Sequence, residues 1–195
     1  MVLLAPVGWA PPGIDHKVWR AALAEDVVDL LAPLAEATAA IAVTAADRPL
    51  AAAVGWPSMP VYEVSQPTPR AALAAAAADG WEQAAVIYAD VPDLPALLIG
   101  KLLRPLSSRT VAVAPATGGG LFGLAARLPV PGWLPDLDGE HDDATQARKA
   151  APTPSEVTST PGWHRQRGPD DLRRLDPALE GWEATRALLT AGSGS

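Results

Sequence analysis

The sequence predicts an α/β protein, a three-layer α/β/α sandwich built on a mostly parallel sheet. Short apolar runs alternate with stretches of helical periodicity through residues 1–115. The apolar runs lack the polar alternation of half-exposed strands, so each strand is expected to be buried on both faces by covering helices. Sandwiches of this class bind ligands beyond the carboxyl ends of their strands.

Five buried strands are expected, at residues 2–5, 39–44, 61–64, 84–89 and 110–114. The helices between them are expected at residues 19–34, 48–54, 69–79 and 96–103. In the first helix the apolar residues repeat at three- and four-residue spacing, and the acidic residues lie elsewhere. Thr68 is a suitable N-cap for the third helix, and Gly80 is a suitable residue to end it.

The last third of the chain has a different pattern. Residues 135–168 mix Asp, Glu, His, Pro, Ser and Thr with little periodicity, which predicts a long flexible loop. Helices within residues 169–191 are expected to pack on the same domain as the α/β core of residues 1–134. The Gly-Ser tail at 192–195 is expected to be disordered.

Composition excludes several classes of protein. A chain of 195 residues suits one domain, and the absence of cysteine excludes disulfides, thiolate zinc sites and cysteine nucleophiles. A formal net charge of −7 without a basic stripe argues against nucleic-acid binding. No apolar run reaches the about 18 residues of a membrane span, and the N-terminus lacks the cationic start of a signal peptide. We therefore expect a soluble, cytoplasmic protein with neither nucleic-acid nor membrane partners.

Asp90 and Asp93 follow the strand at 84–89 in a proline-rich turn. A carboxylate just beyond a buried strand suits a hard cation such as Mg²⁺, because water and phosphate fill the cation's remaining positions. The same pattern suits helix capping, with Asp93 in the favourable first turn of the next helix. Both interpretations stay open from these residues alone.

Two other segments offer groups to an anion. Gly118, Gly119 and Gly120 follow the last predicted strand, and consecutive glycines let backbone amides approach a ligand closely. A tight turn with positive φ explains them equally well. Lys17 and Arg20 lie after the first strand, where they either neutralise a phosphate at a helix N-terminus or are simply solvated.

The histidines give weaker signals. The acidic cluster at residues 140–143 includes His141, but neighbouring residues in a loop rarely converge on one ion. His164 has no recognisable partner in the sequence. There is no Gly-x-Ser-x-Gly segment, and no serine has an evident His and Asp partner, so a hydrolase triad is not expected.

The order of these features resembles the nucleotide-diphospho-sugar transferase (GT-A-like) superfamily. Residues 87–95, 111–115 and 119–124 carry the resemblance, and residues 168–172 are similar to its closing Thr-Pro-x-Asp-Leu motif. The bacterial glycosyltransferase-like proteins associated with arsenosugar biosynthesis are the most similar group. The 2-phospho-L-lactate guanylyltransferases are more distant.

The resemblance implies a Mg²⁺- or Mn²⁺-dependent transferase that binds a nucleotide or nucleotide-sugar on residues 1–134, at the carboxyl edge of the sheet. Asp90 occupies the position of the metal-binding Asp, with Asp93 as a second candidate ligand. A small-molecule acceptor is implied as well.

The remaining site residues follow from the same resemblance. Lys17 and Arg20 lie near the superfamily's Pro-Gly-x-x-Lys-Thr-Arg-Leu pattern, which cradles base and phosphates. The amides of Gly119 and Gly120 would face the acceptor or sugar. Glycosyl transfer is favoured over nucleotidyl transfer, because residues 119–124 fit the first group better.

Two positions depart from the superfamily. Gly118 and Arg167 stand where relatives commonly carry Asp. Losing a carboxylate removes ligand charge, and an Arg inverts it. The alternative to a transferase is therefore a degenerate, non-catalytic relative that keeps the cleft and acts as a binding or scaffold protein.

Overall fold

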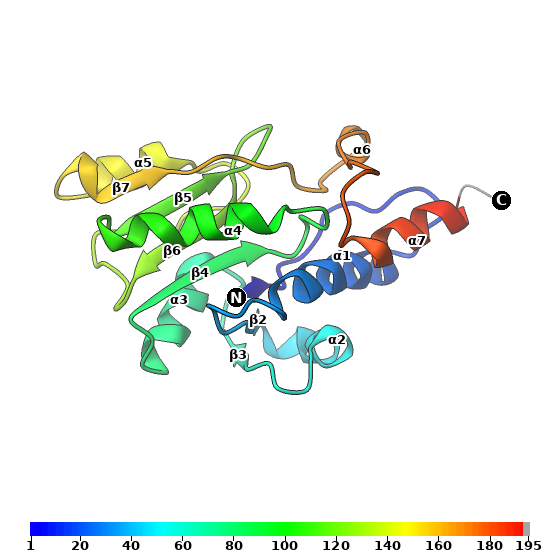
Figure 1. Cartoon of the computed structure of the whole chain (residues 1–195), viewed down its shortest axis with the longest axis horizontal. Helices are drawn as coiled ribbons and strands as arrows, with labels where there is room; N and C mark the ends of the chain where they lie inside the picture. Colours follow the sequence, from blue (N-terminus) through cyan, green and yellow to red (C-terminus); the bar gives the residue numbers. More distant parts are fainter. Residues whose placement is uncertain (193–195) are drawn as a thin grey trace.

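A computed structural model describes residues 1–192 of the chain (Figure 1). Within these residues, seven strands form one sheet in the order β3-β2-β1-β4-β6-β5-β7. Helices cover both faces of the sheet, which confirms the predicted α/β/α sandwich. The expected disordered tail lies outside the described residues, except for Gly192, which ends the last helix.

The strands are β1 (Val2–Leu3), β2 (Ile41–Val43), β3 (Val61–Glu63), β4 (Gln83–Tyr88), β5 (Val111–Pro115), β6 (Leu121–Arg127) and β7 (Val157–Ser159). The pairs β3-β2, β2-β1, β1-β4 and β5-β7 are parallel. Strand β6 is antiparallel to both of its neighbours, β4 and β5. The other six strands therefore end at the same edge of the sheet, the carboxyl edge.

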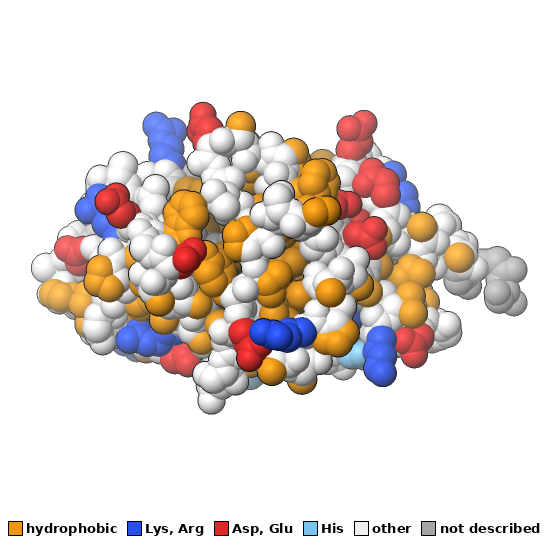
Figure 2. Space-filling view, turned by 90° about the horizontal axis from the view of Figure 1, so that it is seen from below, with side chains coloured by type: hydrophobic (Ala, Val, Ile, Leu, Met, Phe, Trp, Pro, Cys, Tyr) orange, Lys and Arg blue, Asp and Glu red, His pale blue; other side chains and the backbone are white. Residues whose placement is uncertain are grey.

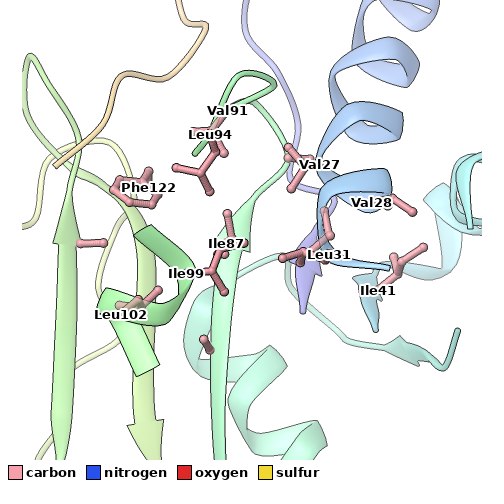
Figure 3. Packing of buried hydrophobic residues seen from close by; sticks show 14 of the residues in the cluster. Val27, Val28, Leu31, Ile41, Ile87, Val91, Leu94, Ile99, Leu102 and Phe122 are labelled. Carbon is pink, nitrogen blue, oxygen red and sulfur yellow. The ribbon is translucent and has the colours of Figure 1, made fainter. Parts of the chain in front are cut away.

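Helices pack on the two faces as separate layers. One face carries α1 (His16–Leu31), α2 (Arg48–Val54) and α4 (Ala96–Leu103), and the other carries α3 (Pro69–Ala78) and α5 (Ala144–Ala150). Figure 3 shows Leu31 of α1 and Ile99 of α4 on either side of Ile87 of β4. Because side chains alternate along a strand, the neighbours Val86 and Tyr88 pack in the opposite layer.

Capping residues fix the ends of two helices. The Thr68 side chain accepts a hydrogen bond from the Ala71 amide and starts α3, and Gly80 follows its end with φ +89°, as predicted. Helix α1 begins three residues earlier than expected, because the Asp15 carboxylate accepts from the Lys17 and Val18 amides. It ends at Leu31, before Pro33, which restricts the residue preceding it.

The prediction of a long loop at residues 135–168 was wrong. This segment contains helix α5 and strand β7, which extends the sheet beside β5. Asp143 caps α5 together with Gln146, in a capping box that the acidic composition concealed. Strand β6 was also missed, because Leu121–Arg127 follows the three glycines and only its first residues were considered, as part of the stretch 119–124.

The C-terminal helix α7 (Glu183–Gly192) lies beside α1 (Figure 1), and the short helix α6 (Pro169–Leu172) precedes it. The buried side chains of Trp19 and Leu23 on α1 pack against Leu188 of α7. Helix α7 therefore packs on α1. Among the described residues, no helix is both apolar and long enough to cross a bilayer.

A buried carboxylate fastens α7 to α1. The two oxygens of Asp26, a residue only 3% exposed, accept hydrogen bonds from the Ala184 and Thr185 amides at the start of α7. Burial raises the pKa of Asp26 from 3.8 to about 6, although the hydrogen bonds from Thr185 and Ala184 oppose that shift. The folded state therefore binds this proton more tightly than the unfolded state does.

The raised pKa of Asp26 makes the stability of the protein depend on pH. Between about pH 4 and pH 6 the folded state holds more protons at this group, so its contribution to the free energy of unfolding falls as pH rises. We expect the difference in unfolding free energy between the native protein and Asp26→Asn to decrease by about 2 kcal/mol from pH 4 to pH 7. Urea denaturation at each pH measures it, with Glu25→Gln, an exposed neighbour on α1, as the matched control. A difference that does not change with pH would contradict the assignment.

Candidate functional site

The predicted site residues follow strands that end at the carboxyl edge of the sheet. Strand β1 leads into the loop before Lys17, strand β4 leads directly into Asp90, and strand β5 leads into the glycine turn. Residues 163–166, in the last third of the chain, cross the same edge, which the sequence did not predict; we call them the crossing segment. The chemistry of this edge depends on that crossing segment.

Asp90 is buried and paired with an arginine. Its side chain is 5% exposed, and its two carboxylate oxygens accept from Nε of Arg165 at 2.8 and 3.0 Å. The guanidinium is itself 2% exposed. A guanidinium therefore neutralises the carboxylate that the superfamily pattern assigns to a metal ion.

Backbone hydrogen bonds hold Arg165 in this position. The Thr117 amide donates to the Trp163 carbonyl, and the Gln166 amide donates to the carbonyl of Asp90 itself. The segment 163–166 is thereby stretched from the end of β5 to the end of β4. Its polar residues His164, Arg165 and Gln166 are all buried.

The rest of the Arg165 guanidinium is also satisfied. Nη1 donates to the carbonyls of Leu121 and Gly139, at 3.2 and 2.8 Å. The group lies 4.1 Å from the centre of the Tyr88 ring, a cation–π contact. Burial alone would lower the pKa of Arg165, but the charge and hydrogen bonds of Asp90 raise it above its usual value. Burial raises the pKa of Tyr88 to about 12, so this phenol stays neutral.

Asp93 is equally committed to protein partners. It is 2% exposed, and its Oδ1 accepts from Trp163 Nε1 at 3.1 Å and lies 3.0 Å from His164 Nε2. Its Oδ2 accepts from the Asp176 amide. Asp93, in the turn after β4, therefore holds two other parts of the chain. One is the segment with Trp163 and His164, and the other is the backbone at Asp176, which follows α6.

These residues do not fit a resident divalent cation. Mg²⁺ and Mn²⁺ require free carboxylate oxygens, whereas the oxygens of Asp90 and Asp93 are taken by Arg165, Trp163 and a backbone amide. In the part of the chain that the structure describes, no three His, Cys, Asp or Glu side chains come together as a metal-binding group. The acidic cluster at 140–143 likewise does not converge on one point.

The three glycines form a closed turn between β5 and β6. Gly118, Gly119 and Gly120 have φ of +88°, +109° and +74°, and the Ala116 amide donates to the Gly120 carbonyl. The interpretation as a tight turn is thus supported. A Cβ on Gly120 would overlap the Gly139 carbonyl oxygen. The turn is therefore packed against the backbone of Gly139 and Glu140.

Arg167, which departs from the superfamily pattern, holds this glycine turn. Its Nη2 donates to the carbonyls of Thr117 and Gly119, at 3.0 and 3.1 Å. Its own amide donates to the Asp171 carboxylate at the start of α6. The substitution of Arg for Asp therefore has a structural role at the same edge.

Lys17 and Arg20 have different surroundings. Lys17 is exposed in the first turn of α1, where its ammonium group is open to water. Arg20 is paired with Asp47 at 2.6 and 2.8 Å and also donates to the carbonyl of Leu4. Arg20 thus fastens the end of β1 to the segment after β2.

Sequence reasoning missed three members of this site, Glu140, His164 and Arg165. His164 does have a partner, since it contacts Asp93 and stacks on Trp163 with ring centres 4.8 Å apart. The available signal was the cluster of charged residues at 164–167 beside a Trp. This cluster did not reveal which residues it contacts, because its partners Asp90 and Asp93 lie in a distant segment of the sequence.

A second concave region lies at the opposite edge of the sheet. A cavity of about 390 Å³ is lined by residues that begin β1, β2 and β4, and its described lining contains no Lys or Arg. Figure 2 shows apolar side chains through the middle of one face and charges of both signs around its margin. This cavity offers no cationic side chain to a phosphate. The carboxyl edge, where Arg165 and Arg167 lie, is therefore the stronger candidate for an anionic ligand.

Comparison with known proteins identifies the fold. No family model matches the chain, and no curated protein matches it by sequence. A solved structure from Desulfovibrio desulfuricans G20, assigned as a nucleotide-diphospho-sugar transferase, is similar over 100% of this chain and 94% of its own, with a TM-score of 0.60 and 17% identity. The chain therefore has the nucleotide-diphospho-sugar transferase (GT-A-like) fold.

A second match has a named activity. Glucosyl-3-phosphoglycerate synthase from Mycobacterium tuberculosis, in complex with Mg²⁺ and UDP, is similar over 95% of this chain and 86% of its own, with a TM-score of 0.53 and 16% identity. Its complex with Mn²⁺, UDP and phosphoglyceric acid matches over 98% and 87%, with a TM-score of 0.53 and 16% identity. At this level of identity the similarity concerns the fold.

The packing of the glycine turn gives a stability test. Gly120→Ala is expected to lower the free energy of unfolding by about 3 kcal/mol or more, because φ is positive and the new Cβ would overlap the Gly139 backbone. Gly132→Ala is the matched control, since a Cβ there meets no atom within 4 Å, and it should change stability by less than about 0.5 kcal/mol. Denaturant unfolding of both variants measures the difference, and equal effects would argue against the packed turn.

Proposed function

We propose that this chain is a glycosyltransferase-like protein that binds a nucleotide or nucleotide-sugar at the carboxyl edge, without a divalent cation on Asp90. The observation that carries the proposal is the buried pair between Asp90 and Arg165. The fold supports the ligand class, and the pair supports binding without metal-dependent transfer. This corresponds to a degenerate relative that has kept the ligand edge of the sheet.

Arginines can take over part of what a cation does for phosphates. A guanidinium is permanently charged and offers planar, paired donors that match phosphate oxygens. It does not bridge several oxygens as an ion does, so the charge on a leaving diphosphate would be less well neutralised. Binding therefore survives this replacement more readily than turnover does.

Individual residues receive roles under this proposal. Lys17 neutralises a phosphate from the first turn of α1, where it is exposed. Of the two predicted glycines, Gly119 is exposed and lies beside the bound sugar or phosphate, although its amide donates to the Ala116 carbonyl, whereas Gly120 is buried. Arg20, committed to Asp47, is a positioning residue for the loop after β1.

A metal-dependent glycosyl- or nucleotidyltransferase is the second candidate, favoured by the fold and by the Mg²⁺, Mn²⁺ and UDP bound to the mycobacterial synthase. Such an enzyme would need Arg165 to leave Asp90. Breaking a buried pair costs about 3–5 kcal/mol, so fewer than about one molecule in a hundred would be open to a metal ion. This cost is why we favour binding without transfer.

Thermal unfolding with a panel of nucleoside diphosphates and their hexose conjugates tests the proposal. At 100 times its dissociation constant a ligand adds about 2.7 kcal/mol, or about 5–10 °C in melting temperature for a domain of this size. We expect one base class to give such a shift, of equal size in Mg²⁺ and in EDTA. A shift that requires Mg²⁺ would support the transferase instead, and no shift with any nucleotide would refute nucleotide binding.

Lys17→Ala provides the residue-level test of the same proposal. Removing an exposed charge from a phosphate contact should weaken binding of the responding nucleotide about fivefold. Lys101→Ala, on the exposed side of α4, should leave the affinity unchanged. Equal affinities for the two variants would remove Lys17 from the site.

A further inference from the structure

Glu140 lies between two arginines at the carboxyl edge. Its Oε1 is 3.1 Å from Nη2 of Arg165, and its Oε2 is 3.3 Å from Nη1 of Arg167. The Glu140 side chain is 48% exposed, whereas those of Arg165 and Arg167 are 2% and 22% exposed. A half-exposed carboxylate thus covers two largely buried guanidinium groups.

We propose that Glu140 is an internal stand-in for a phosphoryl ligand, and that a phosphate or diphosphate group displaces it to bind Arg165 and Arg167 together. This inference rests on the proposed function for the identity of the complete ligand. The inference specifies where the anionic part of that ligand binds. Glu140 then competes with the ligand for the two arginines.

The charges of the cluster support an anion in this position. Arg165 and Arg167 bring two positive charges, and Asp90 balances one of them from inside the protein. Glu140 balances the second from the solvent side, and Asp138 is a further acidic neighbour whose charge acts on Arg165. When the Glu140 side chain turns away, the hydrogen bonds described for the Arg167 guanidinium are those to the Thr117 and Gly119 carbonyls. A phosphoryl group then offers this guanidinium more oxygens than a carboxylate has.

The arginines hold their positions without Glu140. Asp90 and the carbonyls of Leu121 and Gly139 fix the Arg165 guanidinium. The carbonyls of Thr117 and Gly119 fix the Arg167 guanidinium. The donors are therefore preorganised, and a ligand does not have to order them.

Release of Glu140 requires only a side-chain movement. The backbone around it is held independently, by the Leu121 amide donating to the Gly139 carbonyl and by the hydrogen bonds among Asp138, His141 and Asp142. The Glu140 carboxylate is itself 48% exposed, so water can take over its hydrogen bonds when it turns away from the arginines. The neighbouring glycine turn leaves open space above Gly118 and Gly119, where an added Cβ would meet few atoms.

Glu140→Gln tests the proposal, because it removes the charge and keeps the shape. Isothermal titration with inorganic pyrophosphate, in EDTA and at low salt, should show that the variant binds at least about fivefold more tightly than the native protein. Glu63→Gln is the matched control, since Glu63 is 44% exposed and pairs with Arg48 away from this edge. Its affinity for pyrophosphate should equal that of the native protein.

A second variant identifies the binding residue. Adding Arg167→Ala to Glu140→Gln should abolish the gain in pyrophosphate affinity, because one of the two guanidinium groups is then missing. Circular dichroism and the unfolding midpoint confirm that each variant is folded. Unchanged or weaker pyrophosphate binding by Glu140→Gln would overturn the proposal, as would a gain that survives the loss of Arg167.

The same titrations separate this inference from the proposed function. If pyrophosphate shows the expected pattern and no nucleotide binds, the anion site stands and nucleotide binding fails. If a nucleotide binds equally well to the native protein and to Glu140→Gln, nucleotide binding stands and the Glu140 site is refuted. Titration with inorganic phosphate then distinguishes a site for one phosphoryl group from a site for two.

Discussion

The pair between Asp90 and Arg165 is the interaction on which the carboxyl edge depends. A carboxylate that directly follows a central strand is buried at a cost, and only a well-placed counterion repays it. The protein supplies that counterion from the segment 163–166, whose backbone hydrogen bonds join the ends of β4 and β5. Arg165 then also binds the carbonyls of Leu121 and Gly139, so one guanidinium connects four segments.

Under the proposed function, this edge keeps the shape of the fold while the group that meets the ligand's phosphates differs. In the mycobacterial neighbour of the same fold, Mg²⁺ or Mn²⁺ accompanies UDP. Here the positive charge is part of the chain, which makes it permanent and independent of metal supply. A fixed guanidinium is less adaptable than an ion with exchangeable water ligands, and this favours recognition over reaction.

Local sequence patterns located much of the fold and the edge of the sheet with Asp90 and Asp93, but not the side chains that pair with these two carboxylates. The strands at 41–43 and 83–88 and the helix Ala96–Leu103 were predicted because apolar runs and capping residues act within a few positions. Strand β6 was missed because its antiparallel pairing between β4 and β5 is a tertiary choice. Arg165 was missed for a related reason, since its partners lie far away in the sequence and charge alone does not reveal them.

The distance along the chain between the two partners also affects how the protein is made. Arg165 follows Asp90 by 75 residues, so at about 5–20 residues per second it is synthesised roughly 4–15 s later. Strands β1 to β4 are synthesised before Arg165, so until then the Asp90 carboxylate lacks the counterion that it has in the folded protein. The pairing that closes this edge therefore has to wait until the last third of the chain has been synthesised.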